Sequence, residues 1–149
     1  MTSDDIRLIW NLRSHKYEVN FSELKGKVFS DIKGLSEDSE IVGFYIGDKL
    51  AFVLTHLQEC CESVFIEDVC GDINDIIGSE ILMAEEASNN GRGSLSEYDE
   101  SYTWTFYKLA TIKGYVNIRW YGTSNGYYSE SVSLLDVTRF LNPVNNENN

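Results

Sequence analysis

The stretch "YTWTFYKLATIKGYVNIRWYGTSNGYYSESV", Tyr102–Val132, decides the fold class of this chain. Its first residues alternate aromatic side chains with threonines at a period of two, which is typical of a strand with one buried face. Lys113-Gly114 predicts a turn, and Asn125-Gly126 is a strong short signal for a second one. The stretch therefore predicts a three-stranded antiparallel meander.

Segments on either side of this meander carry further strand and helix signals. Runs rich in β-branched and aromatic residues predict strands at Val28–Ile32, Ile41–Ile46, Leu50–Thr55, Ser63–Val69 and Glu80–Ser88. The words "GDINDIIGS" predict one short helix, with Asp72 as its N-cap and Gly78 just past its end. A closing helix is predicted at Leu134–Leu141, because Pro143 prevents its continuation.

These elements together predict an α+β fold that is mainly antiparallel. One sheet cannot hide both of its faces unless it curls or is covered. With about seven strands and two or three short helices, we expect a strongly bent sheet or half-barrel. Residues 21–142 would form a single domain, which suits a chain of 149 residues. Residues 1–20 would be an extension in which Ile6, Ile9 and Trp10 are spaced for a short amphipathic helix, and 143–149 a frayed tail.

Charge is distributed very unevenly along the sequence. Residues 35–100 carry sixteen acidic and two basic side chains, so this middle segment holds the whole imbalance behind the net charge of -12. Such a field repels nucleic acid and attracts basic surfaces or cations. Direct nucleic-acid binding is therefore not expected. The longest apolar runs are too short to cross a bilayer, and the N-terminus has no secretory pattern, so we expect a cytoplasmic protein with reduced cysteines.

Three sequence segments resemble those of a known family: "CCESVFIEDVCGD" (Cys60–Asp72), "ILMAEE" (Ile81–Glu86) and the segment of the predicted meander, Tyr102–Val132. Over roughly Leu24 to Val132 the chain resembles an uncharacterised domain family of small proteins found largely in bacteriophage and prophage genomes. The resemblance implies a phage setting and the cytoplasm of the infected host. It implies no activity and no catalytic residues, since the family is a domain of unknown function.

The acidic middle segment suits a surface complementary to a basic groove. Carboxylates on strands and turns can imitate the phosphates of a duplex. The leading hypothesis is a non-enzymatic phage accessory protein that binds and inhibits a host defence or nucleic-acid-handling protein, in the manner of an anti-CRISPR or DNA-mimic protein. Its contacts would be Glu59, Glu62, Glu67, Asp68, Asp72, Asp75, Tyr127 and Tyr128. The alternative is that these acids only keep the protein soluble.

The runner-up hypothesis is a protein that sequesters a nucleotide signal or a metal ion. Aromatic side chains on the open face of the meander could stack a base while Arg119 pairs with a phosphate, so Trp104, Arg119 and Tyr121 are the candidates. For a metal the candidates are His56, Cys60, Cys61 and Cys70, although neighbouring cysteines in an extended chain point to opposite faces. Catalysis by these cysteines is disfavoured because the surrounding acids oppose thiolate formation. No cofactor is expected.

Overall fold

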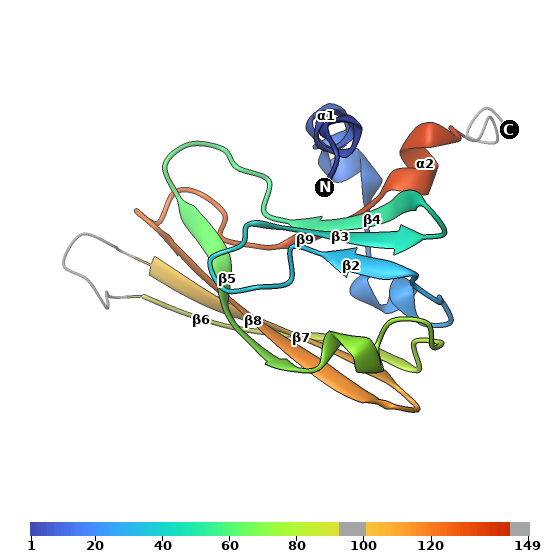
Figure 1. The fold of residues 1–149 in the computed structure, drawn as a ribbon. Coiled ribbons are helices and arrows are strands. Elements are labelled where there is room, and N and C mark those ends of the chain that lie inside the picture. Colours follow the sequence, from blue (N-terminus) through green and yellow to red (C-terminus); the bar gives the residue numbers. More distant parts are fainter. Residues whose placement is uncertain (93–100, 144–149) are drawn as a thin grey trace, which may run out of the picture.

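The computed structural model describes residues 1–92 and 101–143. Strands make up 48% of the described residues, and they form two antiparallel sheets that face each other (Figure 1). The expected α+β fold with a single bent sheet or half-barrel is therefore wrong, and the fold is mainly β. Of the described α-helices, only the first is longer than five residues.

The first sheet has the strand order β1-β9-β4-β3-β2. These strands are β1 (Glu18–Val19), β9 (Ser133–Asp136), β4 (Lys49–Thr55), β3 (Ile41–Ile46) and β2 (Asp31–Lys33). The predicted hairpin of β3 and β4 is confirmed, with a turn at Gly47-Asp48. The strand predicted at Val28–Ile32 starts later, because Val28 makes only an isolated bridge to Glu80.

The second sheet has the order β5-β8-β7-β6. These strands are β5 (Ser63–Gly71), β8 (Gly114–Ser124), β7 (Ser101–Thr111) and β6 (Met83–Arg92). The hairpin of β7 and β8 confirms two strands of the predicted meander. The prediction of a third strand is wrong, because the chain leaves this sheet after Ser124 and next forms β9 in the first sheet.

Helices account for little of the fold. They are α1 (Ser3–Leu12), α2 (Val137–Leu141) and the 3₁₀ turns η1 (His15–Tyr17), η2 (Phe21–Leu24) and η3 (Ile73–Asp75). The closing helix predicted from Leu134 begins only at Val137, since the preceding residues pair with β1 and β4. The helix predicted from "GDINDIIGS" is the single turn η3, although Asp72 does cap it by accepting the Asn74 N–H. Of the predicted frayed tail, only Pro143 lies within the described residues.

The two sheets differ in how their outer faces are covered. α1 and α2 lie on the side of the first sheet that points away from the second sheet (Figure 1). Strands β3 and β4 are consequently buried on both faces and are apolar almost throughout. Strands β7 and β8 instead alternate buried and more exposed residues, because only their inner face meets the core between the sheets. Within residues 1–92 and 101–143, no helix covers the outer face of the second sheet, which we call the open face (Figure 1).

Candidate functional site

The outer face of the second sheet presents aromatic side chains in register. The pairing of β7 with β8 sets Trp104 opposite Tyr121, and the pairing of β8 with β5 sets Tyr121 opposite Phe65. The ring centroids of Trp104 and Tyr121 are 4.3 Å apart, and those of Tyr121 and Phe65 are 6.4 Å apart. All three side chains are half-buried, so each presents part of its ring to solvent. We call these three side chains the aromatic row.

Arg119 connects the aromatic row to the acidic strand β5. Its guanidinium carbon lies 5.5 Å from the centroid of the Trp104 ring, within the range of a cation–π contact. Its Nε donates to Glu67 at 2.5 Å, and its Nη2 lies 3.9 Å from Asp68. The hydrogen bond to Glu67 raises the pKa of the Arg119 guanidinium above its ordinary value. The sequence-predicted ligand residues Trp104, Arg119 and Tyr121 therefore do lie together.

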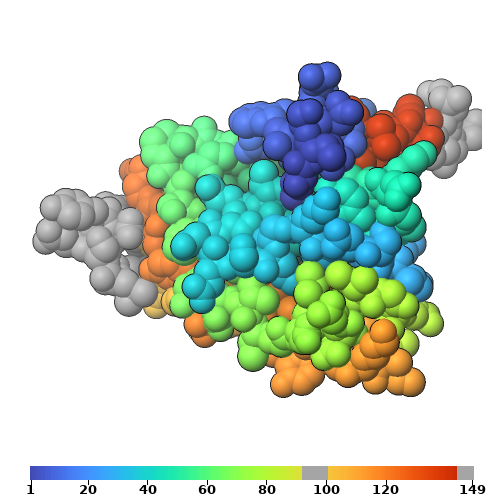
Figure 2. Space-filling model, viewed as in Figure 1, coloured from blue at the N-terminus to red at the C-terminus, as the bar shows by residue number. Residues whose placement is uncertain are grey.

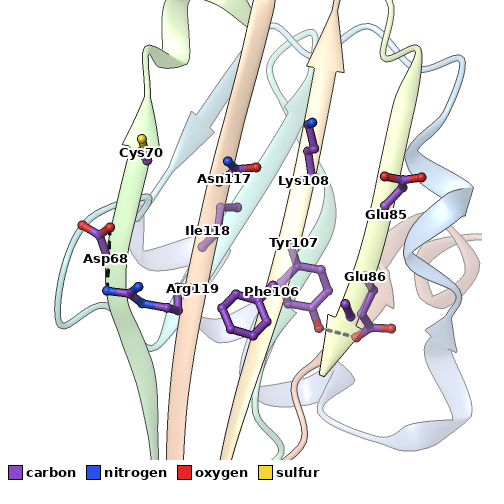
Figure 3. A pocket seen from close by; sticks show the side chains of 11 residues that line it. Asp68, Cys70, Glu85, Glu86, Phe106, Tyr107, Lys108, Asn117, Ile118 and Arg119 are labelled. Atoms are coloured by element: carbon purple, nitrogen blue, oxygen red, sulfur yellow. Dashed lines mark hydrogen bonds and ion pairs between the residues drawn. The ribbon is translucent and has the colours of Figure 1, made fainter. Parts of the chain in front are cut away.

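A recess of about 760 Å³ lies next to the aromatic row, and its lining comes from all four strands (Figure 3). Phe106 and Arg119 are paired across β7 and β8, and Lys108 is paired with Glu85 of β6. Phe106 is 40% exposed, and the Lys108 ammonium lies 5.0 Å from the centroid of the Tyr115 ring. The recess thus places two cations in the middle of the sheet, with carboxylates on both outer strands.

Most predicted acidic contact residues follow the edge strand β5. Glu67 and Asp68 are half-exposed on β5, Glu59 is exposed in the loop before it, and Asp72 is exposed just after it. Much of the flank visible in Figure 2 belongs to residues of the acidic middle segment, coloured from cyan to yellow-green. This distribution gives the aromatic row an acidic border along β5.

Three other predicted contact residues occupy different surroundings. Tyr127 is 87% exposed and Tyr128 is half-buried, and both lie in the loop between β8 and β9. Asp75 is half-buried in η3, beside Gly114. These positions lie at the two ends of the sheet, whereas the aromatic row crosses its surface.

Glu62 is buried and cannot contact a partner. Its carboxylate accepts the Glu59 and Cys60 N–H groups, each at 2.9 Å, and the His56 Nε2–H at 2.7 Å. Burial by itself would raise the pKa of Glu62, but the hydrogen bonds from His56 and from the two amides outweigh it and hold the pKa at about 2. Glu62 is therefore an ionised structural group, and the prediction that it lies on the contact surface is wrong.

The structure does not bring the predicted metal ligands together. Cys60 and Cys61 are joined by a disulfide, contrary to the expected thiols, and Cys70 is an exposed free cysteine on β5. His56 uses both ring nitrogens, on Glu62 and on the Ser131 carbonyl oxygen. Across the part of the chain that the structure describes, no three His, Cys, Asp or Glu side chains are placed to share a metal ion.

The ligand residues predicted from the sequence did not include four residues of this surface: Phe65, Glu85, Phe106 and Lys108. The alternation that singled out Trp104 assigns Phe106 and Lys108 to the same side of β7. Phe65 could have been found by the same parity in "SVFIEDV", where Val64 and Ile66 are the buried positions. Glu85 required knowledge of the β6–β7 register.

Comparisons with known proteins give one match. A family model described as "Domain of unknown function (DUF7448)" matches residues 22–134. No curated protein and no solved structure matches the chain. None of the helices in the described part of the chain has the length and apolarity that a bilayer crossing requires.

Proposed function

Because this chain belongs to DUF7448, a family of domains of unknown function, we propose its function from the geometry of its open face. The protein is a non-enzymatic binding protein that docks a partner protein on the outer face of β5-β8-β7-β6. The partner carries a basic surface. The observation behind this proposal is the aromatic row, which lies on the outer face of this sheet beside Glu67 and Asp68.

The arrangement has the composition of a protein interface. Rigid aromatic side chains and arginine supply most of the binding free energy at such surfaces, and a polar border surrounds them. Trp104 and Tyr121 hold each other in place across two strands, so little conformational entropy is lost when a partner covers them. The carboxylates along β5 would steer a basic partner towards this face and repel nucleic acid.

The setting supports a host protein as the partner. The resemblance to phage and prophage proteins favours a target in the cytoplasm of the infected cell, and a basic surface is typical of proteins that handle nucleic acid. Binding of such a surface would block its access to DNA or RNA. The chain would then inhibit a host defence or nucleic-acid-handling factor.

The test is capture from host lysate with the tagged protein and matched variants. Trp104→Ala/Tyr121→Ala and Glu67→Lys/Asp68→Lys should each lose a partner that the wild type retains. The matched controls are Trp10→Ala, which removes an exposed tryptophan of α1, and Asp48→Lys, which reverses an exposed charge in the β3–β4 turn. Retention of the partner by both open-face variants would exclude this face as the docking surface.

Salt dependence is a second readout of the same experiment. An interface steered by carboxylates should weaken between low and high salt, because exposed charges are screened over about 8 Å at physiological ionic strength. Capture that is unchanged by salt would contradict a role for the acidic border, even if the aromatic row remained essential.

A second candidate function is the binding of a nucleotide-like anion, and the recess is the observation that favours it. Phe106 could stack a base, and Lys108 and Arg119 could pair with phosphate. A nucleotide that binds the folded state should raise the melting temperature with increasing concentration. Lys108→Ala should abolish that increase, whereas Lys49→Ala, at an exposed lysine of β4, should leave it intact.

A further inference from the structure

Three of the four edge strands in this sandwich are protected against pairing with another chain. Strands β1 and β2 are only two and three residues long. Strand β5 contains a register shift between Ile66 and Asp68, and its edge is covered at Ile66. The Ile66 carbonyl accepts the Asp38 N–H at 2.7 Å, and the Ile66 N–H donates to the Ser39 carbonyl at 2.8 Å. Short length, bulges and covering segments are the usual means by which proteins block edge pairing.

The fourth edge is β6, and the described residues give it none of these protections over its middle. The strand is ten residues long, pairs with β7 without a register shift, and contains neither proline nor lysine. The 3₁₀ turn η2 lies beside β6. Among residues 1–92 and 101–143, no backbone hydrogen bond joins the outer edge of Glu86–Asn90 to another segment. The side chains of all five residues are exposed.

The direction of the free backbone groups follows from the β7–β8 turn. Thr111 and Gly114 flank a two-residue turn and therefore exchange backbone hydrogen bonds with each other. Hydrogen-bonding direction alternates along an antiparallel strand, so every second residue of β7 faces β6. Carried across the β6–β7 register, this alternation points the backbone N–H and C=O groups of Glu86, Ser88 and Asn90 outward, away from β7.

We propose that β6 pairs with β6 of a second copy of this chain, antiparallel and centred on Ser88. Within Glu86–Asn90 the carboxylate lies at the first residue and the amides lie at the last two. Antiparallel pairing about Ser88 therefore sets each Glu86 opposite Asn90 of the second copy, where an amide can donate to a carboxylate. Ala87 and Ser88, both small, lie at the centre. Parallel pairing would instead set Glu86 against Glu86.

The resulting dimer joins the two four-stranded sheets into one continuous sheet of eight strands. Only five residues from each copy pair, so the interface is small and the dimer is weak. Each copy carries a net charge of -12, so the two copies repel each other at low salt. Salt should therefore strengthen dimerisation, whereas it should weaken binding of the basic partner proposed above. Pairing of the β6 edge is independent of what binds to the outer face of the sheet.

The test is sedimentation velocity of the full chain from about 5 µM to about 500 µM, at low and at high salt. The expected result is a monomer–dimer equilibrium with a dissociation constant on the order of 100 µM at high salt, and weaker association at low salt. A wild-type chain that stays monomeric at every concentration and at both salt levels would overturn the proposal.

Three substitutions at Ser88 make the test specific to the edge. Ser88→Pro removes an outward N–H without removing a hydrogen bond to β7, and Ser88→Lys adds the charge that natural edges carry. Both should abolish dimerisation, whereas Ser88→Ala keeps the N–H and should retain it. Far-UV circular dichroism and melting curves establish that each variant is folded, and Ser88→Lys decides the question if the proline variant is not. Dimers that persist in a folded Ser88→Pro or Ser88→Lys variant would show that β6 is not the contact.

Discussion

The Nε2 atom of His56 lies 2.7 Å from the Glu62 carboxylate, and both side chains are almost completely shielded from solvent. The other ring nitrogen of His56 lies 2.7 Å from the Ser131 carbonyl oxygen. Both nitrogens face acceptors, and a protonated ring donates to both, so that in this form the contact is a buried ion pair. It joins the segment that leaves β4 to the start of β5 and to the loop that enters β9. The pair thus ties together both connections between the two sheets at this end of the sandwich.

Acid should destabilise the protein through Glu62. Its pKa is about 2 in the folded protein and 4.5 when unperturbed, so the unfolded chain takes up this proton first as the pH falls. The stabilisation is complete above about pH 4.5 and is lost as the pH falls towards 2, by about 3 kcal/mol. Urea unfolding measured at a series of pH values gives this slope. In Glu62→Gln this loss of stability between about pH 4.5 and pH 2 should be absent. An unchanged dependence on pH would assign the loss to other carboxylates.

Removal of His56 alone should lower the free energy of unfolding more than replacement of both His56 and Glu62 by neutral residues. His56→Leu leaves the Glu62 charge buried without a cation, and the free energy of unfolding should fall by about 3 kcal/mol. Addition of Glu62→Gln should recover part of that loss, because the amide is neutral and its oxygen can still accept one of the two N–H groups that now bond to different carboxylate oxygens. Urea unfolding of the two single variants and the double variant measures the coupling. Additive losses would contradict the ion pair.

Neighbouring residues of α1 should differ sharply in their effect on stability. Ile9 is 2% exposed and packs with Leu50, Val53 and Leu135 of the first sheet, whereas Trp10 is 67% exposed. Ile9→Ala should lower the free energy of unfolding by about 2–4 kcal/mol. Trp10→Ala should change it by less than about 0.5 kcal/mol. Equal effects in thermal melts would mean that α1 does not pack on the sheet through this face.

Replacement of Arg119 should weaken binding of the partner without changing the stability of the fold. Its ion pairs with Glu67 and Asp68 are more than a third exposed, and such pairs contribute little to stability. Arg119→Ala should therefore leave the midpoint of urea unfolding almost unchanged while it reduces capture of the partner. Arg119→Lys should restore only part of the capture, because lysine cannot pair with two carboxylates and stack on Trp104 at the same time. A large fall in stability would instead make Arg119 a structural residue.

Elements formed by neighbouring segments could be predicted from the sequence. The hairpins β3–β4 and β7–β8 each carry their own alternation and turn, and the gathering of Trp104, Arg119 and Tyr121 follows from the short turn that sets the β7–β8 register. The division into two sheets depends instead on distant pairing. Strand β9 has only four residues, and it is a strand because Leu134 and Leu135 pair with β1 and β4 on its two sides. Nothing local distinguishes it from the start of a helix.

The acidic segment shows the same limit at the level of single residues. Nine carboxylates lie in the segment from Thr55 to Glu86, and amino-acid type alone predicts that each of them is exposed. Glu62 differs only because the turn at Cys60 brings two backbone amides and His56 onto its carboxylate. That environment arises from tertiary folding, so no pattern in the sequence could separate Glu62 from Glu67.

The strand order of the first sheet constrains how the protein forms during synthesis. Strand β9 lies between β1 and β4, and it pairs Leu135 with Glu18 near the opposite end of the chain. A ribosome delivers residues in order, so β1 has no strand partner until Ser133–Asp136 have been translated. The hairpins β3–β4 and β7–β8 can form earlier from their own residues. Completion of the sandwich is thus deferred until β9 has been synthesised, and a product truncated after Val132 would lack β9 and α2 and leave the first sheet divided.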